Sequence, residues 1–209
     1  MYAVRTELLL PPWRGHEFEA WAMRLKGAWQ KSAGFQGAAL LNSLGYPARY
    51  TILSYWNERE ACRTSDKSAV MGKVVRSGED LFTAPRPQEA YEVVLTVVAP
   101  PIGEGGWSQM VQWEIKAGAA EAFEASRKEL FDLRQSRTKG NLVSRLHRFL
   151  GNSSRYLVWQ VYESREAELA GRQVPAVAEF FRSHPATDYV SSPTVGEYYT
   201  PVAVVPAAS

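Results

Sequence analysis

Residues 49–61 read RYTILSYWNEREA, and residues 155–167 read RYLVWQVYESREA. The shared positions are separated by 106 residues, and the same offset relates Leu44-Gly45 to Leu150-Gly151. Several matches at one offset, without a gap between them, indicate an internal duplication. The fold of one copy should therefore be the fold of the other.

Both copies show the same order of secondary-structure patterns. In the first copy, β-branched and aromatic runs predict strands, and apolar residues at helical spacing predict helices. We expect strands at 2–10, 38–44, 50–56 and 91–98, with helices at 18–29 and 58–76, the first closed by Gly34 and the second broken near Ser65-Asp66. In the second copy we expect strands at 108–116, 142–150, 156–162 and 195–202, with helices at 119–135 and 174–181. Strand, helix, strand, strand, helix, strand is the ferredoxin-like βαββαβ unit of the α+β class.

The strands also suggest how the two copies combine. Tyr50, Ile52 and Trp56 share one face of a predicted strand while Leu53 and Tyr55 share the other, so both faces should be covered. We predict that the two repeats, 1–98 and 108–203, pack sheet to sheet within one chain as a dimeric α+β barrel, joined by a Pro- and Gly-rich linker at 99–107. The alternative is two independent domains with aromatic ligand-facing surfaces.

Composition excludes several classes of protein. The 209 residues are 45% hydrophobic with a formal net charge of +2, and no basic block predicts nucleic acid or an anionic membrane as a partner. No apolar run is long enough to span a membrane and no signal peptide is evident, which predicts a cytoplasmic location. Cys62 is the only cysteine, so we expect an inert, packed thiol. The 7 Trp, 10 Tyr and 8 Phe could build a core or line a pocket for a hydrophobic or aromatic small molecule.

These motifs resemble a known family. Gly34-Phe35-Gln36-Gly37, the strand at 50–56 and Glu58-Arg59-Glu60-Ala61 are similar to the antibiotic-biosynthesis-monooxygenase type of dimeric α+β-barrel domain. The resemblance is closest in the first copy and looser in the second. It implies oxygenation of polycyclic phenols or quinols without metal or flavin, opening of the haem ring, or no established reaction. Cofactor-free chemistry is reasonable because a phenolate is electron-rich enough to reduce O₂ once water is excluded.

The haem-degrading branch of that family can be tested by position. The resemblance would place an Asn on the first strand, a Trp nine residues after Trp56 and a His ten residues further on. Ser65 and Val75 stand at the last two places, and Gly171 and Phe181 stand there in the second copy. The first strands offer no Asn either, which argues against haem degradation by that scheme.

Strand alternation suggests which residues line a pocket. We predict that Tyr50, Ser54 and Trp56, with their repeat partners Tyr156 and Gln160, bind substrate. The residues of opposite parity are then expected to pack against the helices; they are Thr51, Leu53, Tyr55, Leu157, Trp159 and Val161. The alternative is that all these aromatic residues simply fill the barrel.

His147 and Tyr162 are the predicted catalytic residues. A neutral imidazole can accept a phenolic proton, and a tyrosine can stack on a flat ring while donating a hydrogen bond. Leu41 is the repeat partner of His147, so we expect at most one competent site in each chain. A structural His147 is the alternative. Glu7 and Glu114 on the first strands are further candidate bases if buried, and solubilising charges if exposed.

Three functions stay open at this point. The first is a cofactor-independent monooxygenase acting on a flat aromatic or quinol-like molecule, and the second is a non-catalytic small-molecule-binding or stress-related barrel. The third is a haem-binding tandem barrel with His147 or His184 as axial ligand. No phosphate loop, dinucleotide fingerprint or metal-ligand spacing occurs, so no cofactor or metal is expected in the first two cases. The chain could also form a homo-oligomer.

Overall fold

The computed structural model describes residues 1–46, 48–98 and 106–206. Most of the predicted linker, residues 99–105, lies outside the described residues. The first repeat consists of β1 (Tyr2–Leu9), α1 (Gly15–Trp29), β2 (Phe35–Ser43), β3 (Arg49–Trp56), α2 (Arg59–Lys67), α3 (Ala69–Arg76) and β4 (Gln88–Val98). The second consists of β5 (Trp107–Glu114), α4 (Ala120–Arg137), β6 (Asn141–Phe149), β7 (Arg155–Tyr162), α5 (Arg165–Gln173), α6 (Pro175–Ser183) and β8 (Val195–Pro206). Two ferredoxin-like repeats of the α+β class are therefore confirmed.

The chain forms two compact units, which divide within the last strand of each repeat. One unit holds Met1–Tyr91 with the end of β8 from Val202, and the other holds Glu92–Pro201. In the first unit the strand order is β4-β1-β3-β2-β8, and in the second it is β8-β5-β7-β6-β4. Each unit thus contains the antiparallel strand order of a ferredoxin-like sheet, extended at its far edge by part of the other repeat's last strand.

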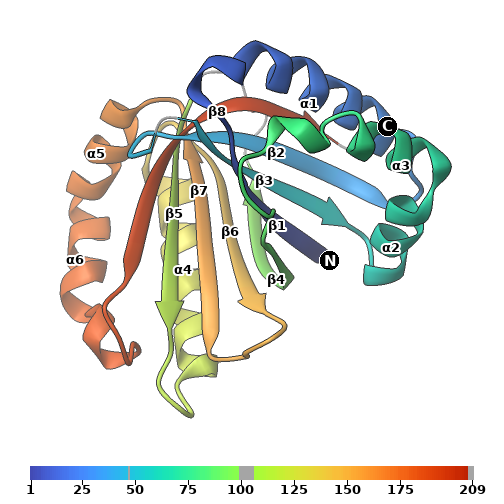
Figure 1. Ribbon diagram of the computed structural model, residues 1–209. Coiled ribbons are helices and arrows are strands. Elements are labelled where there is room, and N and C mark those ends of the chain that lie inside the picture. Colours follow the sequence, from blue (N-terminus) through green and yellow to red (C-terminus); the bar gives the residue numbers. More distant parts are fainter. Residues whose placement is uncertain (47, 99–105, 207–209) are drawn as a thin grey trace. The chain divides into compact units, whose positions relative to one another are not determined.

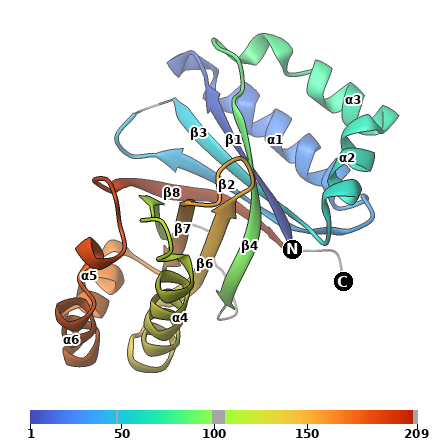
Figure 2. The ribbon, with the colours of Figure 1, turned by 90° about the horizontal axis from the view of Figure 1, so that it is seen from below.

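Helices cover one face of the sheet in each unit (Figures 1 and 2). In the first unit, Phe18 of α1 packs on Tyr50 of β3 with ring centroids 4.4 Å apart. In the second, Phe123 of α4 packs on Tyr156 of β7 at 5.2 Å. Both phenylalanines are fully buried, so these contacts fix the first helix of each repeat to the centre of its sheet.

The turn before β2 recurs before β6. Gly34 and Gly140 have φ angles of 79° and 75°, in the left-handed region that favours glycine. The Gly34 carbonyl accepts a hydrogen bond from the Asn57 amide, and the Gly140 carbonyl accepts one from the Glu163 amide, both at 2.8 Å. The sequence predicted Gly34 as a helix cap, but α1 ends at Trp29. The glycine instead allows a close approach between this turn and the start of the second helical segment.

Strand register confirms the duplication and corrects one part of it. Leu41 pairs with Thr51 and His147 pairs with Leu157, which keeps the 106-residue offset. In the first strands the offset is 105, because Tyr2 pairs with Trp56 whereas Trp107 pairs with Tyr162. Glu7 is thus equivalent to Gln112, whereas the 106-residue offset of the other strands would match it with Trp113. The second repeat has one additional residue between its first two strands.

The helical segments differ from expectation in two places. The break in the first repeat lies at Ser68 rather than near Ser65-Asp66, because Ser68 is extended and its hydroxyl caps α3 by accepting from the Met71 amide at 3.1 Å. In the second repeat we did not predict α5, because its mostly polar residues hide the helical periodicity of its apolar positions. Pro175 starts α6 at a position where a missing amide hydrogen costs nothing.

Both parities of the central strands are buried, as predicted. Every residue of β3 from Tyr50 to Trp56 is buried, and so is every residue of β7 from Tyr156 to Tyr162. No helix in the described part of the chain is long and apolar enough to cross a membrane.

The paired turn glycines provide a test of the fold. A Cβ at Gly34 would meet the side chain of Asn57 and lie 2.7 Å from the Ala61 Cβ, in addition to the strain of its positive φ. We expect Gly34→Ala to lower the free energy of unfolding by about 2 kcal/mol or more. Chemical denaturation measures the change.

Two other glycines distinguish the steric clash at Gly34 from the strain of its positive φ as causes of the lost stability. Gly118 has the same φ of 79° with nothing within 4 Å, so Gly118→Ala should cost only the backbone strain, about 1 kcal/mol. Gly45 has open space and no such φ, and Gly45→Ala should change stability by less than about 0.5 kcal/mol. Equal effects for Gly34 and Gly118 would contradict the proposed close approach.

His147 should make stability depend on pH. Burial lowers the pKa of its imidazole from 6.5 to about 3, whereas the unfolded chain takes up the proton near pH 6.5. The free energy of unfolding should therefore fall, by about 1.4 kcal/mol per unit at most, as the pH drops from about 6.5 toward 3. His147→Leu, which installs the residue that the first repeat has at Leu41, should flatten this slope in urea titrations at several pH values.

The control is His16→Leu, because the His16 side chain is fully exposed. That variant should keep the slope of the unmodified protein. A His147→Leu slope identical to the unmodified one would mean that His147 does not contribute to acid sensitivity.

Candidate functional site

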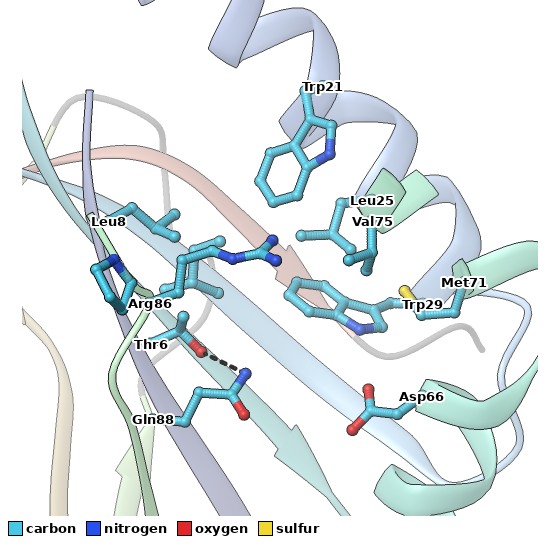
Figure 3. A pocket seen from close by; sticks show the side chains of 12 residues that line it. Thr6, Leu8, Trp21, Leu25, Trp29, Asp66, Met71, Val75, Arg86 and Gln88 are labelled. Atoms are coloured by element: carbon cyan, nitrogen blue, oxygen red, sulfur yellow. Dashed lines mark hydrogen bonds between the residues drawn. The ribbon is translucent and has the colours of Figure 1, made fainter. Parts of the chain in front are cut away.

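A cavity of about 550 Å³ lies between the helices and the sheet of the first repeat (Figure 3). Its walls come from β1, β3, α1, the α2–α3 segment and the chain that leads into β4. The lining residues are Thr6, Leu8, Trp21, Leu25, Trp29, Ile52, Asp66, Met71, Val75, Pro85, Arg86 and Gln88. The two indole rings and the aliphatic side chains beside them offer flat apolar surfaces to an aromatic ligand.

Both tryptophans are held in place by neighbours outside the cavity. The Trp21 Nε1 donates to the Val74 carbonyl oxygen at 2.9 Å, and its ring meets Phe82 edge-on at a centroid distance of 5.3 Å. Trp29 stacks on Phe35 with centroids 5.9 Å apart. These contacts orient the rings before any ligand binds, which lowers the entropic cost of binding.

Four polar side chains enter the same space. The Gln88 Nε2 donates to the Thr6 Oγ1 at 3.4 Å, and the guanidinium of Arg86 extends between the two indoles (Figure 3). Asp66 lies across the cavity from Gln88 (Figure 3). Its side chain reaches solvent, yet the apolar surroundings raise the pKa of its carboxyl group above the usual 3.8. The cavity thus combines a proton acceptor with a cation.

Cys62 lies one helical turn before Asp66. Its thiol donates weakly to the Asp66 Oδ2 at 3.8 Å, and burial raises the thiol pKa to about 12. The thiol therefore stays protonated at neutral pH, which agrees with the packed, unreactive cysteine that the sequence predicted.

The predicted substrate-binding residues of the first repeat, Tyr50, Ser54 and Trp56, do not line the cavity. Ile52, from the same face of β3, is part of the wall. Tyr50 packs on Phe18 at one end of the strand, and burial raises the pKa of its hydroxyl. Ser54 and Trp56 lie toward the other end, where the Trp56 Nε1 donates to the Ser54 Oγ at 3.2 Å. Their role in substrate binding stays a prediction.

The expectation about strand faces is wrong. Tyr50 and Ile52 belong to one apolar cluster with Phe18, Trp21 and Leu25, so this face points toward the helices. The residues of opposite parity, which were expected to pack against the helices, occupy the face away from them; they are Thr51, Leu53, Tyr55, Leu157, Trp159 and Val161. Alternation could not decide the matter because both faces of these strands are apolar and buried.

The predicted residues of the second repeat separate into two groups. His147 is fully buried, and its Nδ1 lies 3.0 Å from the Leu157 carbonyl oxygen, on the sheet face away from the helices. Tyr162 and Gln160 face α4, where both accept hydrogen bonds from Arg134 at 2.6 and 2.7 Å. The structure therefore does not bring His147 and Tyr162 together. Their catalytic role stays a prediction, and the burial of His147 favours its structural alternative.

The remaining candidates have structural partners. The Tyr156 hydroxyl donates to the Glu124 Oε1 at 2.6 Å, and its pKa is raised to about 12, mainly by burial. His184 stacks on Phe180 with centroids 4.5 Å apart. Glu7 is half-buried in an ion pair with Arg49 at 3.1 Å, whereas Glu114 is exposed. No group of three or more potential metal ligands forms within the described residues.

The positions that haem degradation would use carry no ligand atoms for iron. Val75 lines the cavity with aliphatic atoms, and Ser65 instead shares a hydrogen bond of 2.8 Å with Ser32. Phe181 occupies the second-repeat place, where the Arg134 guanidinium lies 5.7 Å from its ring centroid.

Sequence reasoning missed most of the cavity lining. Trp21 and Trp29 lie in the predicted helix 18–29 at helical spacing with Phe18, and this spacing does not distinguish a cavity wall from a core. Asp66 and Arg86 carry no motif, because they belong to a helix turn and a loop that only the fold brings together. The repeat does contain one signal at this site. Arg172 stands at the position equivalent to Asp66, 106 residues further on, so the charge is reversed between the copies.

Comparison with known proteins relates part of the sequence to one family. Residues 108–183 match the family model described as antibiotic biosynthesis monooxygenase. The match lies in the second repeat, although the sequence motifs had suggested a closer resemblance in the first. No curated protein matches the sequence.

Solved structures resemble the chain over nearly its full length. Two that carry the name "putative monooxygenase" come from Fusobacterium nucleatum, with a TM-score of 0.84 and 9% identity, and Lactobacillus acidophilus, with 0.83 and 12%. They cover 98% of this chain, and 94% and 95% of their own chains. A heme-degrading enzyme from Listeria monocytogenes reaches a TM-score of 0.56 at 11% identity, covering 96% of this chain and 99% of its own. At these identities the likeness shows the fold alone. Residues 108–183 thus resemble the antibiotic biosynthesis monooxygenase domain family, within a chain built from two ferredoxin-like repeats.

Proposed function

We propose that the first-repeat cavity binds a flat phenol- or quinol-like molecule and promotes its oxidation by O₂ without a cofactor. One observation carries this proposal: Trp21, Trp29, Asp66 and Arg86 surround a single cavity of about 550 Å³. The indoles would hold the rings of the ligand, and the two charged groups would act on its acidic proton and on the resulting anion.

The chemistry follows from the polar groups. Asp66, with its raised pKa, is a better proton acceptor than an ordinary carboxylate, and a proton taken from the substrate leaves an electron-rich carbanion or phenolate. The guanidinium of Arg86 can stabilise that negative charge within the cavity. The anion itself then reduces O₂, so the protein has to bind, deprotonate and exclude water.

Anthrone is a suitable probe because it is flat, tricyclic and acidic at its methylene carbon. Asp66 would remove one methylene proton, O₂ would form a bond to that carbon, and loss of water would break the O–O bond. One anthrone and one O₂ then give one anthraquinone and one water, with no other reductant required. The family match over residues 108–183 supports oxygenation as the class of reaction.

A non-catalytic binding protein is the second function that the same cavity supports. It would bind anthraquinone or anthrone with the same residues but take up no O₂. Haem binding is less well supported, because Val75 lines the cavity where a histidine would be needed. A Soret band in the purified protein would favour that third function.

Asp66→Asn tests the base. We expect anthrone-dependent O₂ uptake to fall by roughly 10²-fold or more, the lower end for loss of a positioned general base. In the unmodified protein the rate should rise with pH through the pKa of Asp66, and the variant should lose that rise. An oxygen electrode over a pH series measures both.

The stability of the same variant rules out a folding artefact. Because the folded state raises the pKa of Asp66, its ionisation lowers stability as the pH rises, so Asp66→Asn should unfold at the same temperature or higher at neutral pH. Glu60→Gln, an exposed change on the same helix, should leave O₂ uptake intact. Undiminished uptake in Asp66→Asn would refute the role of Asp66.

Trp29→Ala tests binding separately from chemistry. Removal of one stacking ring should weaken the binding of anthraquinone by roughly 10-fold, as measured by quenching of tryptophan fluorescence or by calorimetry. Trp13→Ala is the matched control, because Trp13 is 82% exposed and lies outside the cavity. If both variants bind anthraquinone equally well, the ligand does not occupy this cavity.

A further inference from the structure

A second, smaller cavity adjoins the first-repeat cavity. It has a volume of about 30 Å³, and its walls come from α1, β2, β3 and the end of β8. Leu25, Trp29 and Ile52 line both cavities, so the two spaces share part of one wall. A molecule in the smaller cavity therefore lies close to the ring of Trp29, which we expect to hold the flat substrate.

The lining of the smaller cavity is almost entirely apolar. Lys26 is the one charged residue among the described residues that line it, and apart from the Trp29 indole the other side chains are those of Ala, Leu, Ile and Met. An enclosed water molecule needs about two to four polar partners, whereas a dry apolar cavity accepts an apolar guest such as xenon. The lining thus favours an apolar guest over water.

The volume limits how large that guest can be. A space of roughly 10 to 15 Å³ accommodates one water-sized sphere. The cavity, at about 30 Å³, therefore accommodates roughly two such spheres, which is the size of a diatomic molecule. An aromatic ring or a peptide side chain is too large for it.

The smaller cavity also reaches the surface of the protein. Met23 lines it and is 58% exposed, so its outer end lies beside the exposed face of α1. The other end is the wall of Leu25, Trp29 and Ile52 that it shares with the larger cavity. A small molecule that enters beside Met23 reaches this wall without first passing through the space that the flat substrate would fill.

Larger side chains occupy the equivalent space in the second repeat. The 105-residue offset that aligns Phe18 with Phe123 places Arg127 opposite Ala22 and Arg134 opposite Trp29. Both arginines are buried, and their guanidinium groups pack against aromatic rings at centroid distances of 5.3 to 6.0 Å. The small cavity therefore belongs to the same repeat as the proposed substrate cavity.

We propose that the smaller cavity binds dioxygen and delivers it to the substrate that lies against Trp29. This inference rests on the proposed oxidation in the larger cavity, because that reaction consumes the O₂. Dioxygen is apolar and diatomic, so it fits both the lining and the volume. Ala22 and Ala38 keep the space open, and each lines the smaller cavity and not the larger one.

Xenon tests the site without any turnover, because it is an apolar atom that apolar cavities bind. Nuclear magnetic resonance under xenon pressure should show saturable shifts of the methyl groups of Leu25, Leu40 and Ile52, which line the cavity. Ala22→Leu should fill the space from the helix and weaken xenon binding by at least roughly 10-fold. Ala20→Leu, the same change at an exposed position of α1, should leave xenon binding unchanged.

Oxygen kinetics test the delivery. With anthrone as substrate, Ala22→Leu should raise the KM for O₂ by at least roughly threefold, as measured with an oxygen electrode over a series of O₂ concentrations. The affinity for anthraquinone should not change, because Ala22 does not line the larger cavity. Ala38→Val fills the same space from β2 and should act in the same way, which keeps the test valid if Ala22→Leu does not fold.

The results separate this inference from the proposed function. The inference is overturned if the unmodified protein shows no xenon shifts at this cavity, or if both filled variants keep them. An unchanged KM for O₂ in both filled variants overturns it as well, even where Asp66→Asn confirms the proposed base. If the unmodified protein takes up no O₂ with anthrone, the proposed function fails, and oxygen delivery fails with it even if xenon binds.

Discussion

The packing of one phenylalanine against one tyrosine in each repeat sets the geometry on which the rest of this molecule depends. The contacts of Phe18 with Tyr50 and of Phe123 with Tyr156 attach the first helix of each repeat to the central strand of its sheet. The side chains one to three turns further along that helix then determine what occupies the space between the helix and the sheet. Tryptophans leave a cavity in the first repeat, whereas arginines fill the equivalent space in the second.

The duplication explains why such divergence is possible. A symmetric homodimer must change both of its sites at once, because one sequence encodes both. Here each repeat has its own sequence, and the Asp66 to Arg172 reversal shows two equivalent positions with opposite charge. The same helical pair keeps its spacing while its chemistry changes, from Cys62 with Asp66 to Glu168 with Arg172.

Backbone features are shared between the repeats where side chains are not. The left-handed glycines, their carbonyl hydrogen bonds and the bulges after Phe35 and Asn141 recur in both copies. These features set the register of the central strands, and a one-residue shift there would exchange the two faces of the sheet. The residues that set the strand register are therefore different from those that line the cavity.

The sequence by itself determined the duplication, the α+β class and the order of strands and helices, because these follow from local periodicity and from matches at one offset. It also identified strands buried on both faces, since residues of both parities in 50–56 are apolar. Only the tertiary structure decided which face of the sheet packs against the helices, because the two faces are equally apolar and the sequence does not distinguish them. It alone brought Asp66, Arg86 and Trp29 around one cavity, since they are distant in sequence and share no spacing. It also placed His147 away from Tyr162, because neighbouring strand positions of opposite parity point to opposite sides of a sheet.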